Sequence, residues 1–309
     1  MEYKRVLTIQ DISCVGQCSL TVALPILSAS GTETCILPSA VLSNHTAGFT
    51  GFTFRDLSDD MPKISAQWKK EKISFDCIYT GYLGSVQQIG YVRDIFAAHC
   101  KGLKIVDPAM ADNGRLYVGF DETYAAEMAK LCWEADITLP NITEACMMTH
   151  TPYREVYDRD FIEDLLRKMR ELGAKTIILT GVSYRPGYTG VVINVEGVST
   201  YYEHKKLETG CHGTGDVYAS AFTGALMQGF NEQEAARIAA DYTVLCIEKT
   251  VGDPKHWYGV KFELALPEYI RMLGLWKRTI RREIARLNTL IHQQDLENFR
   301  KAAAEAIAK

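Results

Sequence analysis

The stretch GCHGTGDVYASAF, residues 210–222, is the part of the sequence best suited to chemistry. Gly213 and Gly215 precede a run of small and apolar residues typical of a buried helix, and Asp216 stands at its start. A helix N-terminus favours anions because its first N–H groups lack partners within the helix, and glycines let a large anion approach the backbone. The stretch therefore fits a phosphate cradle with Asp216 as a base, or a buried helix that Thr214 or Asp216 caps.

Further polar residues follow the predicted strands. We expect strands at residues 5–10, 34–39, 76–81, 103–108, 135–140, 175–181 and 190–195, because these runs are rich in apolar and β-branched residues. Polar side chains lie at or just beyond their carboxyl ends, namely Asp11, Asp107, Asn141, Glu144 and Thr180. Open α/β sheets bind ligands at that edge. The alternative is that these residues only form turns, which favour Asp and Asn.

The elements that must position these residues alternate along the chain. Helical patterns separate the predicted strands, for example at residues 85–100 and 158–173, and the second has an apolar stripe with a period of about 3.6 residues. Such alternation predicts the α/β class, with a mostly parallel central sheet and helices on both faces.

Composition excludes several classes of protein. The chain has 309 residues, 47% of them hydrophobic, and a formal net charge of −4, which gives no reason to expect a nucleic acid or an anionic membrane as a partner. No apolar run approaches the roughly 20 residues that span a bilayer, and the first residues do not resemble a signal peptide. The nine cysteines are scattered and form no zinc pattern, so we expect reduced thiols in a cytoplasmic protein.

Other phosphate-binding signatures are missing from the sequence. It contains no G-x-x-x-x-G-K-[ST] motif, and Tyr218 occupies the position of the third glycine of a dinucleotide fingerprint. The H-R-D and D-F-G motifs of protein kinases are also missing.

The remaining motifs resemble one family of small-molecule kinases. GTGD at the start of a small-residue helix resembles the signature of the ribokinase-like superfamily. The match narrows to the pyridoxal kinases through LSNHTAGF, TGYLGS, VDPAMADNGRLYV and ADITLPNITEACMMT, which occur in family order within residues 4–270. The resemblance implies ATP-dependent phosphorylation of the 5′-hydroxymethyl group of pyridoxal, pyridoxamine or pyridoxine. It also implies Mg²⁺, a monovalent cation such as K⁺, and a homodimer.

The resemblance assigns a role to each candidate residue. Asp216 is the base, and the backbone of Gly213, Thr214 and Gly215 is the anion hole. The pyridine site is lined by Asn44, Thr46 and Tyr82. The nucleotide phosphates and their ions are faced by Asp112, Asn141, Glu144, Thr180 and Thr214, and the metal is held by Asp107 and Glu144.

Two departures from the family pattern leave alternatives open. Asp11 stands where the family carries a serine, so either Asp11 or Ser13 contacts the pyridine ring, and an ionised Asp11 suits the ammonium group of pyridoxamine. The segment CHGTG resembles hydroxymethylpyrimidine kinases, in which a cysteine often follows the motif; here Asp216 has that place and Cys211 precedes it. The alternatives are a hydroxymethylpyrimidine kinase and a non-catalytic protein that binds pyridoxal phosphate or a nucleotide.

The last 35 residues are a separate question. Residues 275–309 lack proline and glycine, and Ile280, Ile284, Leu287 and Ile291 form a helical stripe. The family resemblance does not reach this tail. We therefore expect a kinase domain at residues 1–274 and a helical extension at residues 275–309, which is either engineered or docks on the domain or a partner.

Overall fold

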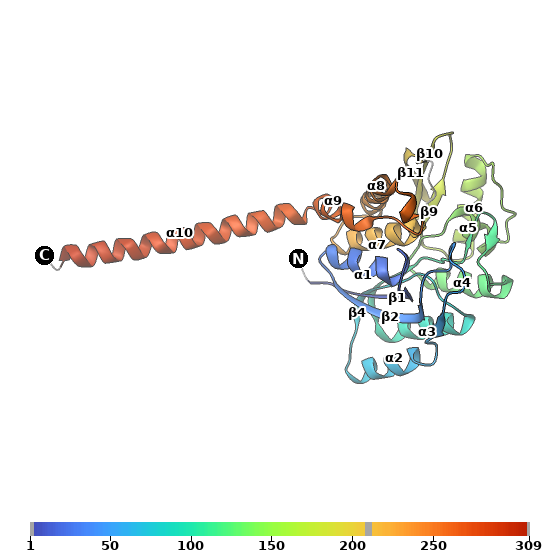
Figure 1. Ribbon diagram of the computed structural model, residues 1–309, viewed down its shortest axis with the longest axis horizontal. Helices are drawn as coiled ribbons and strands as arrows, with labels where there is room; N and C mark the ends of the chain where they lie inside the picture. Colours follow the sequence, from blue (N-terminus) through green and yellow to red (C-terminus); the bar gives the residue numbers. More distant parts are fainter. Residues whose placement is uncertain (1–2, 208–211, 308–309) are drawn as a thin grey trace.

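The computed structural model describes residues 3–207 and 212–307, and these form a large sheet with helices on both faces (Figure 1). The strands are β1 (Arg5–Ser13), β2 (Glu33–Leu42), β3 (Phe54–Asp56), β4 (Phe75–Thr80), β5 (Cys100–Val106), β6 (Ala111–Asp112), β7 (Arg115–Leu116), β8 (Ile137–Thr138), β9 (Thr176–Val182), β10 (Tyr188–Val195) and β11 (Val198–Lys205). The helices are α1 (Leu20–Ala29), α2 (Met61–Lys70), α3 (Val86–His99), α4 (Glu122–Glu134), α5 (Ile142–Met148), α6 (Arg159–Glu171), α7 (Thr214–Met227), α8 (Glu232–Thr250), α9 (Leu266–Met272) and α10 (Leu275–Ile307).

The sheet is mostly parallel, as the sequence predicts. Its strand order is β11-β10-β9-β8-β5-β4-β1-β2-β3. β1 lies between β2 and β4, and parallel pairing continues through β5 and β8 to β9. The antiparallel pairs β2–β3, β9–β10 and β10–β11 lie toward the two edges. The parallel strands therefore all end at the same edge, where the predicted polar residues gather.

Two apolar cores fill the space between the sheet and its helices. Side chains alternate between the faces of a strand, so Leu7 and Ile9 of β1 join one core while Val6 joins the other. Helices α2 to α6 cover the first core, and α1, α7, α8 and α9 cover the second. Burial on both faces explains why the central strands are apolar throughout.

Two strands differ from the sequence prediction. The strand predicted at residues 135–140 contains only Ile137 and Thr138 in regular pairing, and an isolated bridge between Asn141 and Thr180 follows it. β11 was not predicted, and it pairs with β10 through a turn at Glu196 and Gly197, both with positive φ.

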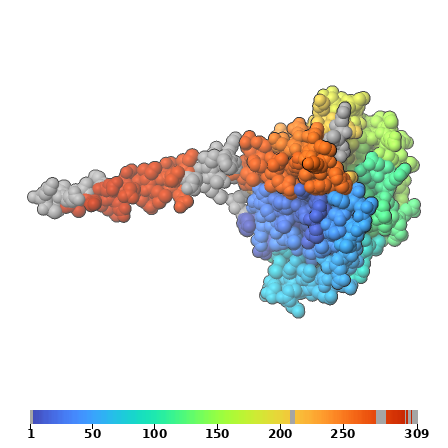
Figure 2. All heavy atoms as spheres, viewed as in Figure 1, coloured from blue at the N-terminus to red at the C-terminus, as the bar shows by residue number. Residues whose placement is uncertain are grey.

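The tail forms one helix, α10, that extends away from the rounded body (Figures 1 and 2). Its first residue, Leu275, packs against the second core. Farther along, Ile284, Leu287 and Ile291 are about half exposed. No helix in the described part of the chain is long and apolar enough to cross a membrane.

Candidate active site

The glycine-rich stretch leads into α7, which begins at Thr214 rather than after Gly215 as predicted. Gly213 precedes the helix with a φ of 77°, and a Cβ there would lie 1.7 Å from the backbone oxygen of Gln17. The N-cap residue of α7 is Gly213, which has no side chain, so α7 lacks the N-cap side-chain hydrogen bond present at α3, α4 and α6. Thr214 and Asp216 lie within the first turn of α7, and neither occupies its N-cap position.

Asp216 lies in the first turn of α7, where the helix dipole favours a negative charge. Burial nevertheless raises the pKa of Asp216 to about 7, and the negative charge of Asp11 adds to this shift. A hydrogen bond from the backbone N–H of Ser19 opposes it. A carboxyl group that titrates near neutral pH suits a general base.

Asp11 lies in β1 near its carboxyl end and is 4% exposed. The hydroxyl of Ser13 donates to Oδ2 of Asp11 at 2.9 Å, and the Ser19 hydroxyl lies near enough to influence the pKa of the same carboxyl. Burial raises the pKa of Asp11, while both hydroxyls lower it. Ser19 therefore lies close to both Asp11 and Asp216, and it lowers the pKa of each.

Ser19 holds this position with an unusual backbone. It precedes α1 with a φ of 56°, in the region that normally favours glycine. Strained residues of this kind gather at functional sites, where the surrounding structure enforces them. Ser19 is therefore a candidate site residue that the sequence did not indicate.

A second acidic group lies beyond the ends of β5 and β8. Asn141 and Glu144 form a capping box at α5: each side chain accepts the backbone N–H of the other at 2.9 Å. Oε1 of Glu144 also accepts the N–H of Met110 at 3.0 Å. Burial raises the pKa of Glu144 to about 7 and raises that of Asp107, which the charges of Glu144 and Asp216 raise further. Asp216 therefore interacts electrostatically with Asp11 on one side and with Asp107 on the other.

Asp112 and Thr180 lie at the same edge. Asp112 is exposed on the β6–β7 hairpin, and its negative charge contributes to the raised pKa of Glu144. Thr180 belongs to β9, where its N–H donates to the Pro140 oxygen at 2.9 Å. Tyr117 was not singled out from the sequence; it is 42% exposed, and partial desolvation followed by the charge of Glu144 raises its pKa.

The segment LSNHTAGF is held by its histidine. His45 is 3% exposed; its Nε2 lies 2.6 Å from the Tyr258 oxygen, and its Nδ1 accepts the N–H of Ala47 at 3.1 Å. With both ring nitrogens engaged, His45 orients the segment. Asn44 is half-buried and Thr46 is exposed.

Tyr82 lies nearer the acidic residues. It stacks on Phe120 with ring centroids 5.5 Å apart, and burial raises its pKa to about 12, with a contribution from the charge of Asp11. Within the described residues, no hydrogen bond joins Asn44 or Thr46 to Asp11. Cys211 lies outside the described residues.

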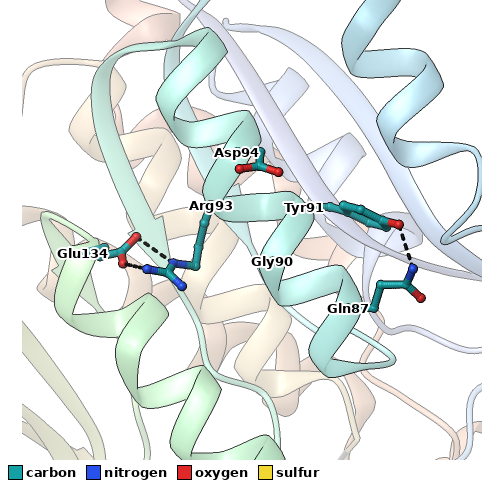
Figure 3. A pocket seen from close by; sticks show the side chains of 6 residues that line it. All are labelled: Gln87, Gly90, Tyr91, Arg93, Asp94 and Glu134. Carbon is teal, nitrogen blue, oxygen red and sulfur yellow. Dashed lines mark hydrogen bonds and ion pairs between the residues drawn. The ribbon is translucent and has the colours of Figure 1, made fainter.

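The other features of the described residues that could form a site lie apart from the candidate residues or are missing. They contain no group of three or more His, Cys, Asp or Glu residues placed to hold a metal ion. A surface hollow of about 570 Å³ lies between α3 and α4 (Figure 3). Its lining residues, of which Arg93 and Glu134 form an ion pair, include none of the candidate site residues.

Comparison with known proteins assigns the family. Residues 26–259, well over half of the chain, match the phosphomethylpyrimidine kinase family. The chain belongs to that family. The pyridoxine/pyridoxal/pyridoxamine kinase of Bordetella avium is 26% identical over 262 residues, which are 79% of this chain and 85% of that protein.

Solved structures of related proteins resemble this chain in both sequence and fold. A candidate phosphomethylpyrimidine kinase from Bacteroides thetaiotaomicron, crystallised with pyridoxal, is 38% identical with a TM-score of 0.81, over 87% of this chain and 96% of that one. The pyridoxal kinase from Lactobacillus plantarum is 30% identical with a TM-score of 0.82, over 88% and 98%. The resemblance to the pyridoxal kinases and their ribokinase-like fold is therefore confirmed.

Proposed function

We propose that this kinase transfers the γ-phosphoryl group of ATP to the 5′-hydroxymethyl group of a B6 vitamer, that is, pyridoxal, pyridoxamine or pyridoxine. The observation that carries this proposal is the position of Asp216, whose pKa is raised to about 7, in the first turn of a helix that a glycine precedes. The likeness to a protein crystallised with pyridoxal supports the choice of substrate.

In the proposed step, Asp216 takes the proton of the hydroxymethyl group. The oxygen attacks the γ-phosphorus of ATP, and the bond from that phosphorus to the bridging oxygen breaks, releasing ADP. The backbone N–H groups of Gly213, Thr214 and Gly215 stabilise the charge on the transferred group. Asp11, Ser13, Asn44, Thr46 and Tyr82 hold the pyridine ring.

The acidic edge fits the cations that the family implies. Mg²⁺ neutralises phosphate charge during phosphoryl transfer and needs only one or two carboxylates beside the phosphates. Asp107 fits this task, because the hydrogen bond it accepts from Ala109 at 3.2 Å leaves oxygen lone pairs for an ion. Glu144 already accepts backbone N–H groups at both oxygens, so it would hold the ion together with Asp107 mainly through its negative charge. Asp112, Asn141 and Thr180 face the nucleotide, and K⁺ binds at the same edge.

A second candidate is hydroxymethylpyrimidine kinase activity, which the name of the matched family favours. An ATP-consumption assay on the full chain with each vitamer and with hydroxymethylpyrimidine separates the two. We expect turnover with a vitamer, dependent on Mg²⁺ and abolished by excess chelator. Turnover with hydroxymethylpyrimidine alone would support the second candidate. Ligand binding without ATP consumption would indicate a non-catalytic protein.

We further propose that the kinase works as a homodimer in the cytoplasm, as its resemblance to the pyridoxal kinases implies. Sedimentation equilibrium on the full chain would test the dimer, and a monomer at micromolar concentration would contradict it.

A further inference from the structure

Three consecutive rings follow α8, in a loop that packs against the segment LSNHTAGF. We call residues 256–259 the aromatic loop. The rings of Trp257 and Tyr258 lie 4.7 Å and 6.1 Å from that of Phe49, measured between centroids. A Cβ added to Gly48 would lie 2.8 Å from a carbon of the Trp257 ring. The backbone of the segment therefore passes directly beside Trp257, where only glycine leaves room for the ring.

A hydrogen bond joins the same loop to the segment. Because Nδ1 of His45 accepts the N–H of Ala47, the neutral ring carries its proton on Nε2. Nε2 therefore donates to the backbone oxygen of Tyr258, at 2.6 Å. The His45 ring also meets the Phe49 ring nearly edge-on, with centroids 4.9 Å apart. The segment is thus held to the aromatic loop at two points, His45 and Phe49.

The aromatic loop also contacts the segment between β1 and α1. A Cβ added to Gly259 would lie 2.4 Å from the Cβ of Gln17. The backbone oxygen of Gln17 in turn lies beside Gly213, at the proposed anion hole. The side chain of Gln17 donates to Glu263 at 2.9 Å, shortly beyond the loop. The aromatic loop therefore lies where the proposed ring-binding segment and the proposed phosphate cradle come together.

The rings of this cluster stand apart from the apolar cores. Among the described residues, the two cores and the side chains packed against them include neither Phe49, Trp257 nor Tyr258. Trp257 is 48% exposed, so about half of its surface stays in contact with solvent. A half-exposed ring buries less apolar area than a core ring and stabilises the fold less. The contacts of Trp257 are therefore better suited to fixing the position of one segment than to holding the fold together.

We propose that the aromatic loop positions Asn44 and Thr46 for the vitamer, with Trp257 as the positioning residue. This inference rests on the proposed function, in which Asn44 and Thr46 hold the pyridine ring, and it adds a residue from a distant part of the chain. Asn44 and Thr46 flank His45, so a segment released from Trp257 no longer holds them in one place for the substrate. The residues proposed to face the nucleotide lie on other elements, so ATP binding should not depend on Trp257.

The test measures kcat and both KM values in the full chain, in Trp257→Ala and in Trp257→Phe. In Trp257→Ala, KM for the vitamer should rise about 3- to 10-fold, which is the effect expected for the loss of an aromatic pair. KM for ATP and kcat should not change. Trp257→Phe should recover most of the loss, because phenylalanine keeps a ring beside Phe49 and Gly48. Titration calorimetry measures the affinities for the vitamer and for ATP independently of turnover.

Trp68→Ala is the matched control. Trp68 makes the same kind of contact, because it meets the rings of Phe75 and His99 edge-on with centroids 5.4 Å and 5.8 Å apart. It lies on α2, which covers the first core, whereas α7 covers the second. Its loss should lower the thermal midpoint and leave the ratio of the two KM values unchanged.

Two outcomes would overturn the inference. Either KM rises by the same factor for vitamer and ATP in Trp257→Ala, or the thermal midpoint falls while neither KM changes; both would show that the loop serves the fold in general. If Trp257→Ala does not fold, Trp257→Leu takes its place under the same criteria, because leucine keeps apolar volume without a ring.

Failure of the proposed function gives a different result. If the chain phosphorylates hydroxymethylpyrimidine and no vitamer, the proposed function is wrong, and KM for hydroxymethylpyrimidine then tests the aromatic loop in the same variants. If it phosphorylates neither compound, the calorimetric affinities for vitamer and ATP decide whether Trp257 positions the segment.

Discussion

At the scale of single residues, the environment of Asp216 sets its chemistry. The dipole of α7 favours a charged carboxylate, but burial and the charge of Asp11 raise its pKa to about 7. These opposing effects leave a group that is ionised for a large fraction of the time at neutral pH and still holds a proton strongly enough to accept one. That balance is what a general base requires.

Replacing Asp216 with asparagine should remove the base while keeping the size of the side chain. We expect kcat to fall roughly 10²- to 10⁴-fold, as is typical for the loss of a general base, with binding of ATP and vitamer largely retained. Steady-state kinetics measures the fall in kcat, and titration calorimetry measures whether the variant still binds ATP and the vitamer. Near-normal turnover in the variant would exclude Asp216 as the base.

The pH dependence of the reaction should report the same group. Because the base acts in its ionised form, kcat/KM should rise with pH and level off above about pH 7. For stability the sign is opposite: the raised pKa means that the folded chain binds more protons than the unfolded chain between about pH 4 and 7, so this group makes folding less favourable as pH rises through that range. Urea unfolding of the parent chain and of Asp216→Asn at several pH values in this range measures the difference in their stability. A kcat/KM that stays constant from pH 5.5 to 8.5 would contradict the assignment of Asp216 as the base.

At the scale of elements, the site depends on how the segment between β1 and α1 packs against the start of α7. The backbone oxygen of Gln17 occupies the space beside Gly213, and Ser19 in the same segment lowers the pKa of both Asp11 and Asp216. The ring of His45 lies equally close to Gly16, where an added Cβ would be 2.1 Å from the ring. The segment between β1 and α1 is thus held between the start of α7 on one side and His45 on the other.

We expect the substitution Gly213→Ala to push the start of α7 away from the segment between β1 and α1. Alanine is unfavourable at a φ of 77° by about 1–2 kcal/mol, and its Cβ would also overlap the Gln17 oxygen at 1.7 Å. We expect a lower thermal midpoint and at least a tenfold loss of kcat/KM for ATP, to be measured by calorimetry and kinetics. Gly90→Ala is the control: an added Cβ there meets nothing within 4 Å in the interior of α3, so stability should be kept or slightly increased. A fully active Gly213→Ala variant would show that the close approach is not required.

At the scale of the whole molecule, α10 stands apart from the proposed reaction. The helix has 33 residues, about 50 Å if regular, and projects from the body with Ile284, Leu287 and Ile291 about half exposed. The candidate site residues all precede it in the chain. An amphipathic helix of this kind owes most of its stability to packing, so its apolar stripe needs a partner.

A chain that ends at Gly274 should keep its turnover per site but change its size in solution or its thermal stability. Light scattering, calorimetry and a kinase assay test these expectations. A chain that ends at Leu275 is the useful comparison, because Leu275 packs against the second core and its loss alone could lower stability. Loss of turnover in a shortened chain that remains folded would show that the tail contributes to the active site, and the proposed boundary at residue 274 would be wrong.

The sequence by itself determined the fold class and the edge at which the site lies. Apolar runs such as residues 175–181 and the stripe of α6 are local patterns, and parallel strands place Asp107 and Asn141 at one edge wherever the helices pack. The motif order also identified the family, because it depends only on residue types and spacing.

Only the tertiary structure decided how the acidic residues are partnered. Ser19 gives no local signal, because its position beside Asp216 depends on packing between segments about 200 residues apart. The positive φ of Gly213 and the close approach of the Gln17 oxygen to it likewise depend on how distant segments pack. Burial and neighbouring charge set a pKa, and both depend on the whole surrounding fold rather than on the residue itself.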